Sequence, residues 1–150
     1  MIFFIMIISI VIFDQWTKNI ALNKLKDGVS HTIWNNKLKL TLYKNKGVAL
    51  NFFKKYPKFI KRVVILIILI LVFFMIKIVN KKNLIFEKIG LGFIIGGGIG
   101  NLIDRIKKGY VVDFFKFNFK KCPIFNFADL FIILGSIIIQ VLLIRKDTIN

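Results

Sequence analysis

The sequence is poor in the residue types that most enzymes use for chemistry. Its 150 residues include one cysteine, one histidine and seven acids, against 24 lysines and arginines. The single Cys122 excludes an internal disulfide, and His31 lies far from it in the sequence, so neither a Cys–His nor a Ser–His nucleophile is indicated. The clustered His and Cys ligands of a zinc site are also missing. We therefore expect no metal and no other cofactor.

Apolar residues, in contrast, make up 57% of the chain. A helix needs about 20 predominantly apolar residues to cross a bilayer, and four stretches meet this condition. We predict membrane spans at about residues 2–22, 59–79, 87–105 and 125–144 of a single domain, 1–150. The first span has no basic start and no small-residue cleavage site, so we interpret it as a retained helix and not as a signal peptide.

The net charge of +17 does not by itself indicate nucleic-acid binding. Basic loops that flank apolar spans are typical of membrane proteins whose lysines contact anionic lipid headgroups. An AT-rich genome would raise the lysine content in the same way. We expect membrane lipids, and no nucleic acid, as partners.

The longest polar segment lies between the first two spans, at residues 23–58. Within it, residues 37–43 alternate basic or polar with apolar side chains, which indicates a half-buried strand. Asn45, Lys46 and Gly47 then give a turn signal. We predict an all-α membrane protein with four transmembrane helices and a small β cradle, about 23–58, that lies on the membrane surface.

Alternation of the spans brings several acids to one side of the membrane. With four spans both termini share one side, and Asp14, Asp104, Asp113 and Asp129 lie toward the other. Acids beside apolar segments are costly to hold there, so they are the first candidates for chemistry. Two carboxylates in a half-dry site share a proton, and such a pair can activate water, one as base and one as acid.

Basic residues that lie near these acids in the sequence make roles other than catalysis possible for them. Asp14 and Lys18 are spaced i,i+4 on one helix face, and Arg105 is the expected partner of Asp104 at the end of the third span. Salt bridges with lysines are an alternative role for Asp113 and Asp129. A proton or cation pathway in a small transporter is a second alternative, and a purely structural membrane protein is a third.

Five segments resemble, in order along the chain, the motifs of bacterial lipoprotein signal peptidase, also called signal peptidase II, the third and fourth segments together matching one motif. They are Asp14-Gln15-x-Thr17-Lys18, Asn45-x-Gly47-x-Ala49, Gly100-Asn101-x-x-Asp104-Arg105, Gly109-x-Val111-x-Asp113-Phe114 and Phe125-Asn126-x-Ala128-Asp129. Together they extend over nearly the whole chain. Two positions depart from the family pattern: Leu50 follows Ala49 where Phe is usual, and Gly98 stands where Ala is common.

The resemblance implies an aspartic endopeptidase of the bacterial cytoplasmic membrane, with its active site and β cradle on the extracytoplasmic face. It would cleave prolipoproteins just before a cysteine that carries diacylglycerol. Asp113 and Asp129 would be the catalytic dyad, supplied within one chain, so that a monomer is sufficient. The residues that would bind substrate or support the site are Asp14, Lys18, Asn45, Gly47, Asn101, Asp104, Arg105 and Asn126.

The charge distribution predicts the opposite orientation in the membrane. Most of the 24 lysines and arginines lie on the side that carries the acids, whereas loops rich in these residues are ordinarily cytoplasmic. We follow the motifs, because residues 23–58 are expected to be folded and the lysine excess has a compositional explanation.

Overall fold

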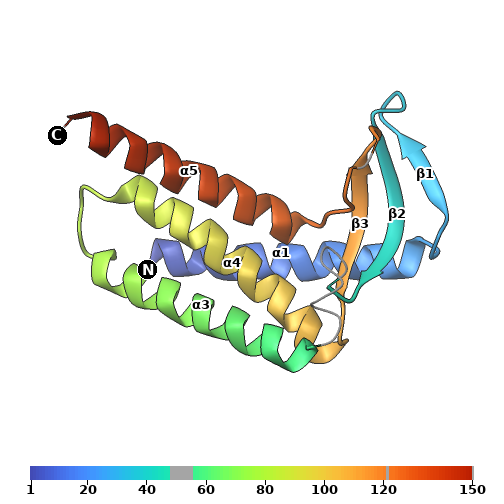
Figure 1. The fold of residues 1–150 in the computed structure, drawn as a ribbon, viewed down its shortest axis with the longest axis horizontal. Helices are drawn as coiled ribbons and strands as arrows, with labels where there is room; N and C mark the ends of the chain where they lie inside the picture. The colour runs from blue at the N-terminus through green and yellow to red at the C-terminus, as the bar shows by residue number, and fades with distance from the viewer. Residues whose placement is uncertain (48–55, 121, 150) are drawn as a thin grey trace.

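The computed structural model describes residues 1–47, 56–120 and 122–149, and it contains four long helices with a small sheet at one end (Figure 1). The helices are α1 (Ile2–Lys24), α3 (Pro57–Ile78), α4 (Ile85–Lys107) and α5 (Phe127–Ile149). Each is long and apolar enough to cross a membrane. The predicted fold class, four transmembrane helices with a small β element, is confirmed.

The composition of α3 explains both its start and its surroundings. Pro57 occupies the first turn, where a helix does not need the missing N–H. Further along, Leu66, Leu69 and Phe73 are each more than half exposed. A surface of this kind is unfavourable in water, and it is expected where lipid acyl chains surround the helix.

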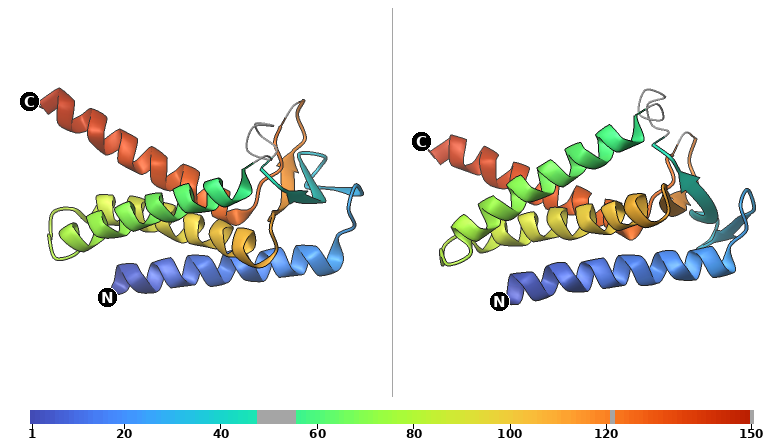
Figure 2. Two further views of the ribbon diagram at one scale, coloured as in Figure 1. Left: turned by 60° about the horizontal axis from the view of Figure 1, so that its bottom comes forward. Right: turned by 90° about the horizontal axis from the view of Figure 1, so that it is seen from below.

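Helix α4 packs against all three other helices, and the right-hand view of Figure 2 shows it between α1 and α3. Its glycines permit this packing, because a Cβ atom would collide with Met6 at Gly92, with Ile10 at Gly96 and with the backbone of Ala128 at Gly97. Small residues let helices approach closely in a bilayer. The glycines of α4 are therefore packing positions.

The sheet is antiparallel, with strands in the order β1 (Ser30–Ile33), β2 (Leu38–Asn45) and β3 (Val111–Phe117). Strand β2 confirms the strand expected at 37–43. Strand β3 was not predicted, and it shows that the sheet is not built from residues 23–58 alone. Five consecutive residues of β3 are buried, so its sequence lacks the alternation that identifies a half-exposed strand.

A hydrophobic cluster joins this sheet to the helices. Ala21 of α1 is buried with Phe114 and Phe115 of β3. Six further apolar residues, from the end of α1, the sheet, α5 and the segment before α5, pack against them: Leu25, Leu38, Leu40, Phe125, Phe127 and Leu130. Phe115 also pairs with Phe125, whose N–H donates to the Phe115 carbonyl at 2.7 Å. The cluster therefore fixes β3, and with it Asp113, relative to α1 and α5.

Candidate active site

Four aspartates from four different elements gather where the helices meet the sheet. They are Asp14 of α1, Asp104 of α4, Asp113 of β3 and Asp129 of α5. The first three are almost completely buried, and Asp129 is partly exposed. The convergence that alternation of the spans predicted is confirmed by a continuous network of contacts that joins them through Lys18, Asn101 and Asn126.

Lys18 is the centre of the buried part of this network. Its Nζ lies 2.8 Å from Asp14 Oδ2 and 3.2 Å from Asp104 Oδ2, and all three side chains are inaccessible to solvent. The same Nζ donates to Asn101 Oδ1 at 2.9 Å. Burying a charge is unfavourable unless it is paired, so the two carboxylates and the amide oxygen explain why Lys18 is tolerated here. The predicted Asp14–Lys18 pair is confirmed.

The expected pair between Asp104 and Arg105 is wrong. Asp104 is bound by Lys18 and by Lys108, whose Nζ lies 2.7 Å from Oδ1, and it accepts the Val112 N–H at 3.1 Å. Arg105 donates to the Asn101 carbonyl at 3.2 Å. Successive helical residues point about 100° apart, so Asp104 faces α1 while Arg105 faces a cavity. The i,i+4 spacing of Lys108 would have identified this partner from the sequence.

Asn126 contacts both remaining aspartates. Its Nδ2 donates to Asp113 Oδ1 at 2.7 Å, and its backbone N–H donates to Asp129 Oδ2 at 3.2 Å. In return, its Oδ1 accepts the Asp129 N–H at 3.0 Å. This reciprocal pair caps the first turn of α5. One fully buried asparagine therefore holds the Asp113 and Asp129 carboxylates on either side of itself.

Two more asparagines complete the hydrogen bonding of these carboxylates. Asn45 Nδ2 donates to Asp113 Oδ2 at 2.9 Å, and Asn101 Nδ2 donates to Asp129 Oδ1 at 2.8 Å. The Asn101 Oδ1 accepts from Lys18 and, at 3.1 Å, from Asn126. Because its oxygen is bound in this way, the Asn101 amide can present only its N–H group to Asp129.

The environment of Asp113 favours its protonated form. Burial raises the pKa of Asp113 from 3.8 to about 7. The negative charge of Asp129 acts in the same direction, whereas the hydrogen bonds from Asn45 and Asn126 oppose it. In the part of the chain that the structure describes, neither Asp113 nor Asp129 forms a salt bridge, which argues against the salt-bridge alternative.

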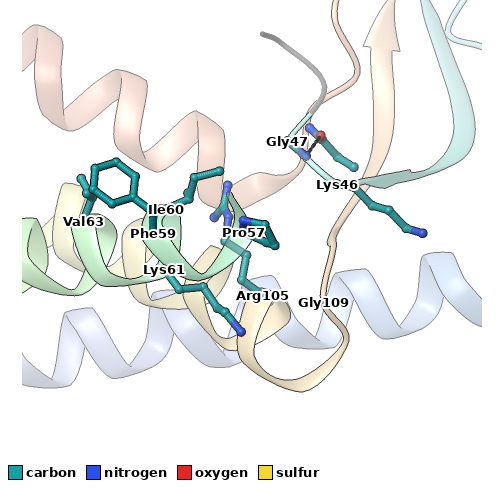
Figure 3. A pocket seen from close by; sticks show the side chains of 10 residues that line it. Lys46, Gly47, Pro57, Phe59, Ile60, Lys61, Val63, Arg105 and Gly109 are labelled. Carbon is teal, nitrogen blue, oxygen red and sulfur yellow. Dashed lines mark hydrogen bonds between the residues drawn. The ribbon is translucent and has the colours of Figure 1, made fainter. Parts of the chain in front are cut away.

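Asp113 and Asp129 both line a cavity of about 310 Å³. A second cavity of about 380 Å³ has apolar walls formed at the start of α3 by Phe59, Ile60 and Val63 (Figure 3). Asn45 and Arg105 line both cavities. The polar group of a ligand held between the two aspartates would therefore lie next to a compartment suited to an apolar chain.

Of the remaining motif residues, Gly47 supports Asn45. Its N–H donates to Asn45 Oδ1 at 2.9 Å, and its φ of +91° favours glycine. Ala49 and Leu50 lie outside the described residues. Among the residues described, no group of three His, Cys, Asp or Glu side chains is placed to hold a metal ion.

The register of the sheet brings Asn45 to Asp113, which the sequence did not indicate. Tyr43 of β2 pairs with Asp113 of β3, and Asn45 pairs with Val111. The signal that would have revealed β3 is its run of β-branched and aromatic residues, Val111 to Phe117.

Comparison with known proteins identifies the family of the chain. The model of signal peptidase (SPase) II matches residues 6–145. The lipoprotein signal peptidase of Clostridium tetani is 37% identical over 146 residues, which are 95% of this chain and 92% of that protein. That of Caldanaerobacter subterraneus is 37% identical over 147 residues, or 97% and 99% of the two chains.

Solved structures show the same fold. A bacterial membrane enzyme determined by the in meso method at 2.3 Å resolution superposes with a TM-score of 0.89 at 31% identity, covering 99% of this chain and 90% of its own. A second, at 1.9 Å resolution, gives a TM-score of 0.86 at 33% identity, covering 94% and 91%.

Proposed function

The chain belongs to the signal peptidase II family and is an aspartic-type signal peptidase, and we propose that it removes signal peptides from prolipoproteins with Asp113 and Asp129 as its catalytic dyad. Residues 1–150 would act as one peptidase domain. One observation carries the proposal: the two carboxylates share Asn126 and line one cavity, and no cation among the described residues neutralises them through a salt bridge.

In the proposed reaction a water molecule is the nucleophile. The Asp129 carboxylate accepts a proton from the water as its oxygen attacks the carbonyl carbon of the scissile amide. Asp113 donates its proton to the leaving nitrogen when the C–N bond breaks. The products are a carboxylic acid and an amine. Asp129 then holds the proton, and its transfer back to Asp113 restores the dyad.

The other residues would position this pair. Asn45 and Asn126 would orient Asp113, and Asn101 would orient Asp129, through the hydrogen bonds described above. Arg105, which lines both cavities, would bind the substrate backbone. Further support comes from a set of residues that hold the helix ends and the turn after β2 in place: Asp14, Lys18, Asp104 and Gly47.

The proposed substrate is a prolipoprotein whose cysteine carries diacylglycerol. Acyl chains stay in the bilayer, so the bond before such a cysteine lies at the membrane interface, and the apolar cavity formed by Phe59, Ile60 and Val63 suits one of these chains. We place the enzyme in the bacterial cytoplasmic membrane, surrounded by its lipids, with the dyad on the extracytoplasmic face. A monomer suffices, because one chain supplies both aspartates.

The test compares three variants in proteoliposomes: Asp113→Asn, Asp129→Asn and, as a matched control, Asp27→Asn. Asp27 is exposed and pairs with Lys44 on the surface. Each dyad variant should remain inserted and lose about 10²–10⁴-fold or more in cleavage rate, the range typical of a lost acid or base, while the control keeps its activity. Normal cleavage by either dyad variant would refute the dyad.

The lipid requirement needs a separate substrate pair. The same prolipoprotein is offered with and without diacylglycerol on its cysteine. We expect cleavage of the modified form alone, and equal cleavage of the two forms would refute the proposed substrate while leaving the dyad untouched.

A further inference from the structure

The outer end of the sheet carries apolar side chains that the helices do not cover. Ile33 pairs with Leu38, and Leu38 pairs with Phe117, so the three side chains lie on one face of the sheet. Leu38 belongs to the cluster around Ala21 of α1, which identifies this face as the one turned toward the helices. Ile33 and Phe117 are nevertheless each 41% exposed.

Two further rings lie at this end of the sheet. Trp34, in the turn between β1 and β2, is 69% exposed, and Phe119, just beyond β3, is 65% exposed. The Phe119 ring stacks on that of Phe117, with centroids 6.3 Å apart and an interplanar angle of 13°. We call Ile33, Trp34, Phe117 and Phe119 the sheet tip.

Hydrogen bonds unite the two halves of the sheet tip. The Asn118 N–H donates to the Lys37 carbonyl at 2.9 Å, and Asn118 Nδ2 donates to the Asn36 carbonyl at 2.7 Å. The turn of the β1–β2 hairpin and the end of β3 are thereby tied together. The β1–β2 turn and the end of β3 are therefore expected to move together.

At this end of the sheet the opposite face is polar. Thr32 pairs with Lys39, and Lys39 pairs with Lys116, so this end has one basic and one apolar face. Figure 1 shows the strands running across the ends of the helices, with the β1–β2 turn at one end of the sheet. Since the helices are those able to span the membrane, the uncovered part of the helix-facing surface lies opposite the lipid beside them.

We propose that the sheet tip is a lipid-binding surface that enters the interfacial layer of the bilayer. Tryptophan favours that layer because its ring is amphipathic. Lys37 and Lys120 are exposed beside the tip and would contact anionic phospholipid headgroups. Apolar rings flanked by positive charge fit a lipid surface, and this combination selects the bilayer over a second protein as the occupant.

The contact would set the height of the dyad above the lipid. Strand β3 carries Asp113, and β2 carries Asn45, which donates to it. Both strands are hydrogen-bonded to each other along the sheet, so anchoring the tip restrains both residues. The inference requires that the helices span a membrane and does not depend on the proposed cleavage reaction.

Fluorescence of Trp34 tests the contact directly. The chain has two tryptophans, so Trp16→Phe leaves Trp34 alone, and Trp34→Phe leaves Trp16 of α1 as a reference. In lipid nanodiscs that contain phosphatidylglycerol, we expect blue-shifted Trp34 emission, loss of that emission with lipids brominated in the upper acyl chain, and protection from acrylamide. If acrylamide quenches the Trp34 emission and brominated lipid does not, the proposal is overturned. The tip would then be open to a protein partner.

Charge reversal tests the headgroup contact. The double variant Lys37→Glu/Lys120→Glu, made in the Trp16→Phe chain, should red-shift Trp34 and reduce its quenching by brominated lipid. The matched control, Lys81→Glu/Lys82→Glu, alters exposed lysines in the connection between α3 and α4 and should change neither. An equal response of the two variants would refute the role of Lys37 and Lys120. The fluorescence of Trp34 can be interpreted even if the protein shows no cleavage in the assay of the proposed function.

Discussion

Asp14 and Ala128 are joined by a hydrogen bond that links α1 to the first turn of α5. The Ala128 N–H donates to Asp14 Oδ1 at 3.0 Å, and the other oxygen of Asp14 binds Lys18 at 2.8 Å. The first N–H groups of a helix have no partner within it, and here a buried carboxylate from another helix supplies one. Asp129 is the next residue of α5, so its position depends on α1.

Replacement of Asp14 should therefore destabilise the fold. Asp14→Ala leaves the Ala128 N–H without its acceptor and Lys18 with one carboxylate fewer, and breaking a buried pair costs about 3–5 kcal/mol. Asp14→Asn should cost less, since it keeps an oxygen for Ala128 and Lys18 keeps Asp104. Thermal unfolding in detergent measures both.

The matched control for Asp14 is Asp27→Asn. Asp27 and Lys44 are about half exposed, and exposed pairs contribute about 0–1 kcal/mol. We expect an unfolding midpoint close to that of the unchanged chain. If Asp14→Ala and Asp27→Asn shifted the midpoint equally, the buried network would have no special role in stability.

Cleavage should have a high-pH limit near neutrality. The pKa of Asp113 is raised to about 7, so Asp113 holds its proton below that pH and loses it above. The proposed reaction needs that proton for the leaving nitrogen, so kcat/KM should fall as pH rises through about 7. A rate profile between pH 5 and pH 9, taken in detergent with the diacylglyceryl-modified prolipoprotein as substrate, checks this. A rate that kept rising with pH would contradict the assignment of Asp113 as the acid.

Asn45→Ala should move that limit to higher pH. The hydrogen bond from Asn45 lowers the pKa of Asp113, so its removal raises the pKa further and lets the proton persist into more alkaline solution. The maximal rate should also fall, because Asp113 loses an orienting contact. Asn83→Ala, in the exposed connection before α4, is the control and should leave the profile unchanged. A downward shift for Asn45→Ala would show that another effect controls the proton.

Two adjacent glycines of α4 offer a matched comparison. A Cβ atom at Gly97 would collide with the carbonyl oxygen of Ala128 and lie 2.8 Å from Ile132, whereas one at Gly98 would lie at an ordinary 3.4 Å from Ile68. Gly97→Ala should thus separate α4 from α5 near Asp129 and cost about 1–3 kcal/mol through overpacking. Gly98→Ala should be neutral or stabilising by up to about 1 kcal/mol, since alanine favours the helix.

Thermal unfolding and cleavage rate should be measured together for both glycine variants. We expect Gly97→Ala to lower both and Gly98→Ala to preserve both. Equal stability and activity in the two variants would mean that the α4–α5 contact does not position Asp129.

Much of the fold could be predicted because its information is local. Each span must satisfy its own backbone hydrogen bonds in lipid, so a long apolar stretch is sufficient to indicate a helix. Residues four apart on a helix are neighbours, which made the Asp14–Lys18 pair visible. Strand β3 was missed because it is buried on both faces and its sequence has no alternation.

Partners that lie far apart along the chain could not be predicted from the same local rules. The i,i+4 spacing indicates Lys108 as a partner of Asp104, but nothing local indicates Lys18, which binds Asp104 from 86 positions away. Which of the many cations reaches a given acid depends on how the helices pack. The glycines of α4 set that packing. The spacing of residues along one helix does not predict which cation then contacts an acid on another helix.

The sequence by itself determined that four helices span a membrane, that the acids gather at one end of them, and, through its motifs, which family the chain resembles. Only the tertiary structure decided how Asp113 and Asp129 are held. The pairing of β2 with β3 brings Asn45 to Asp113, and the contact of Lys18 with Asn101 directs that amide toward Asp129. The physical reason is range: helix formation is settled within a few residues, whereas the direction of a hydrogen bond depends on side chains that meet only after the helices have packed.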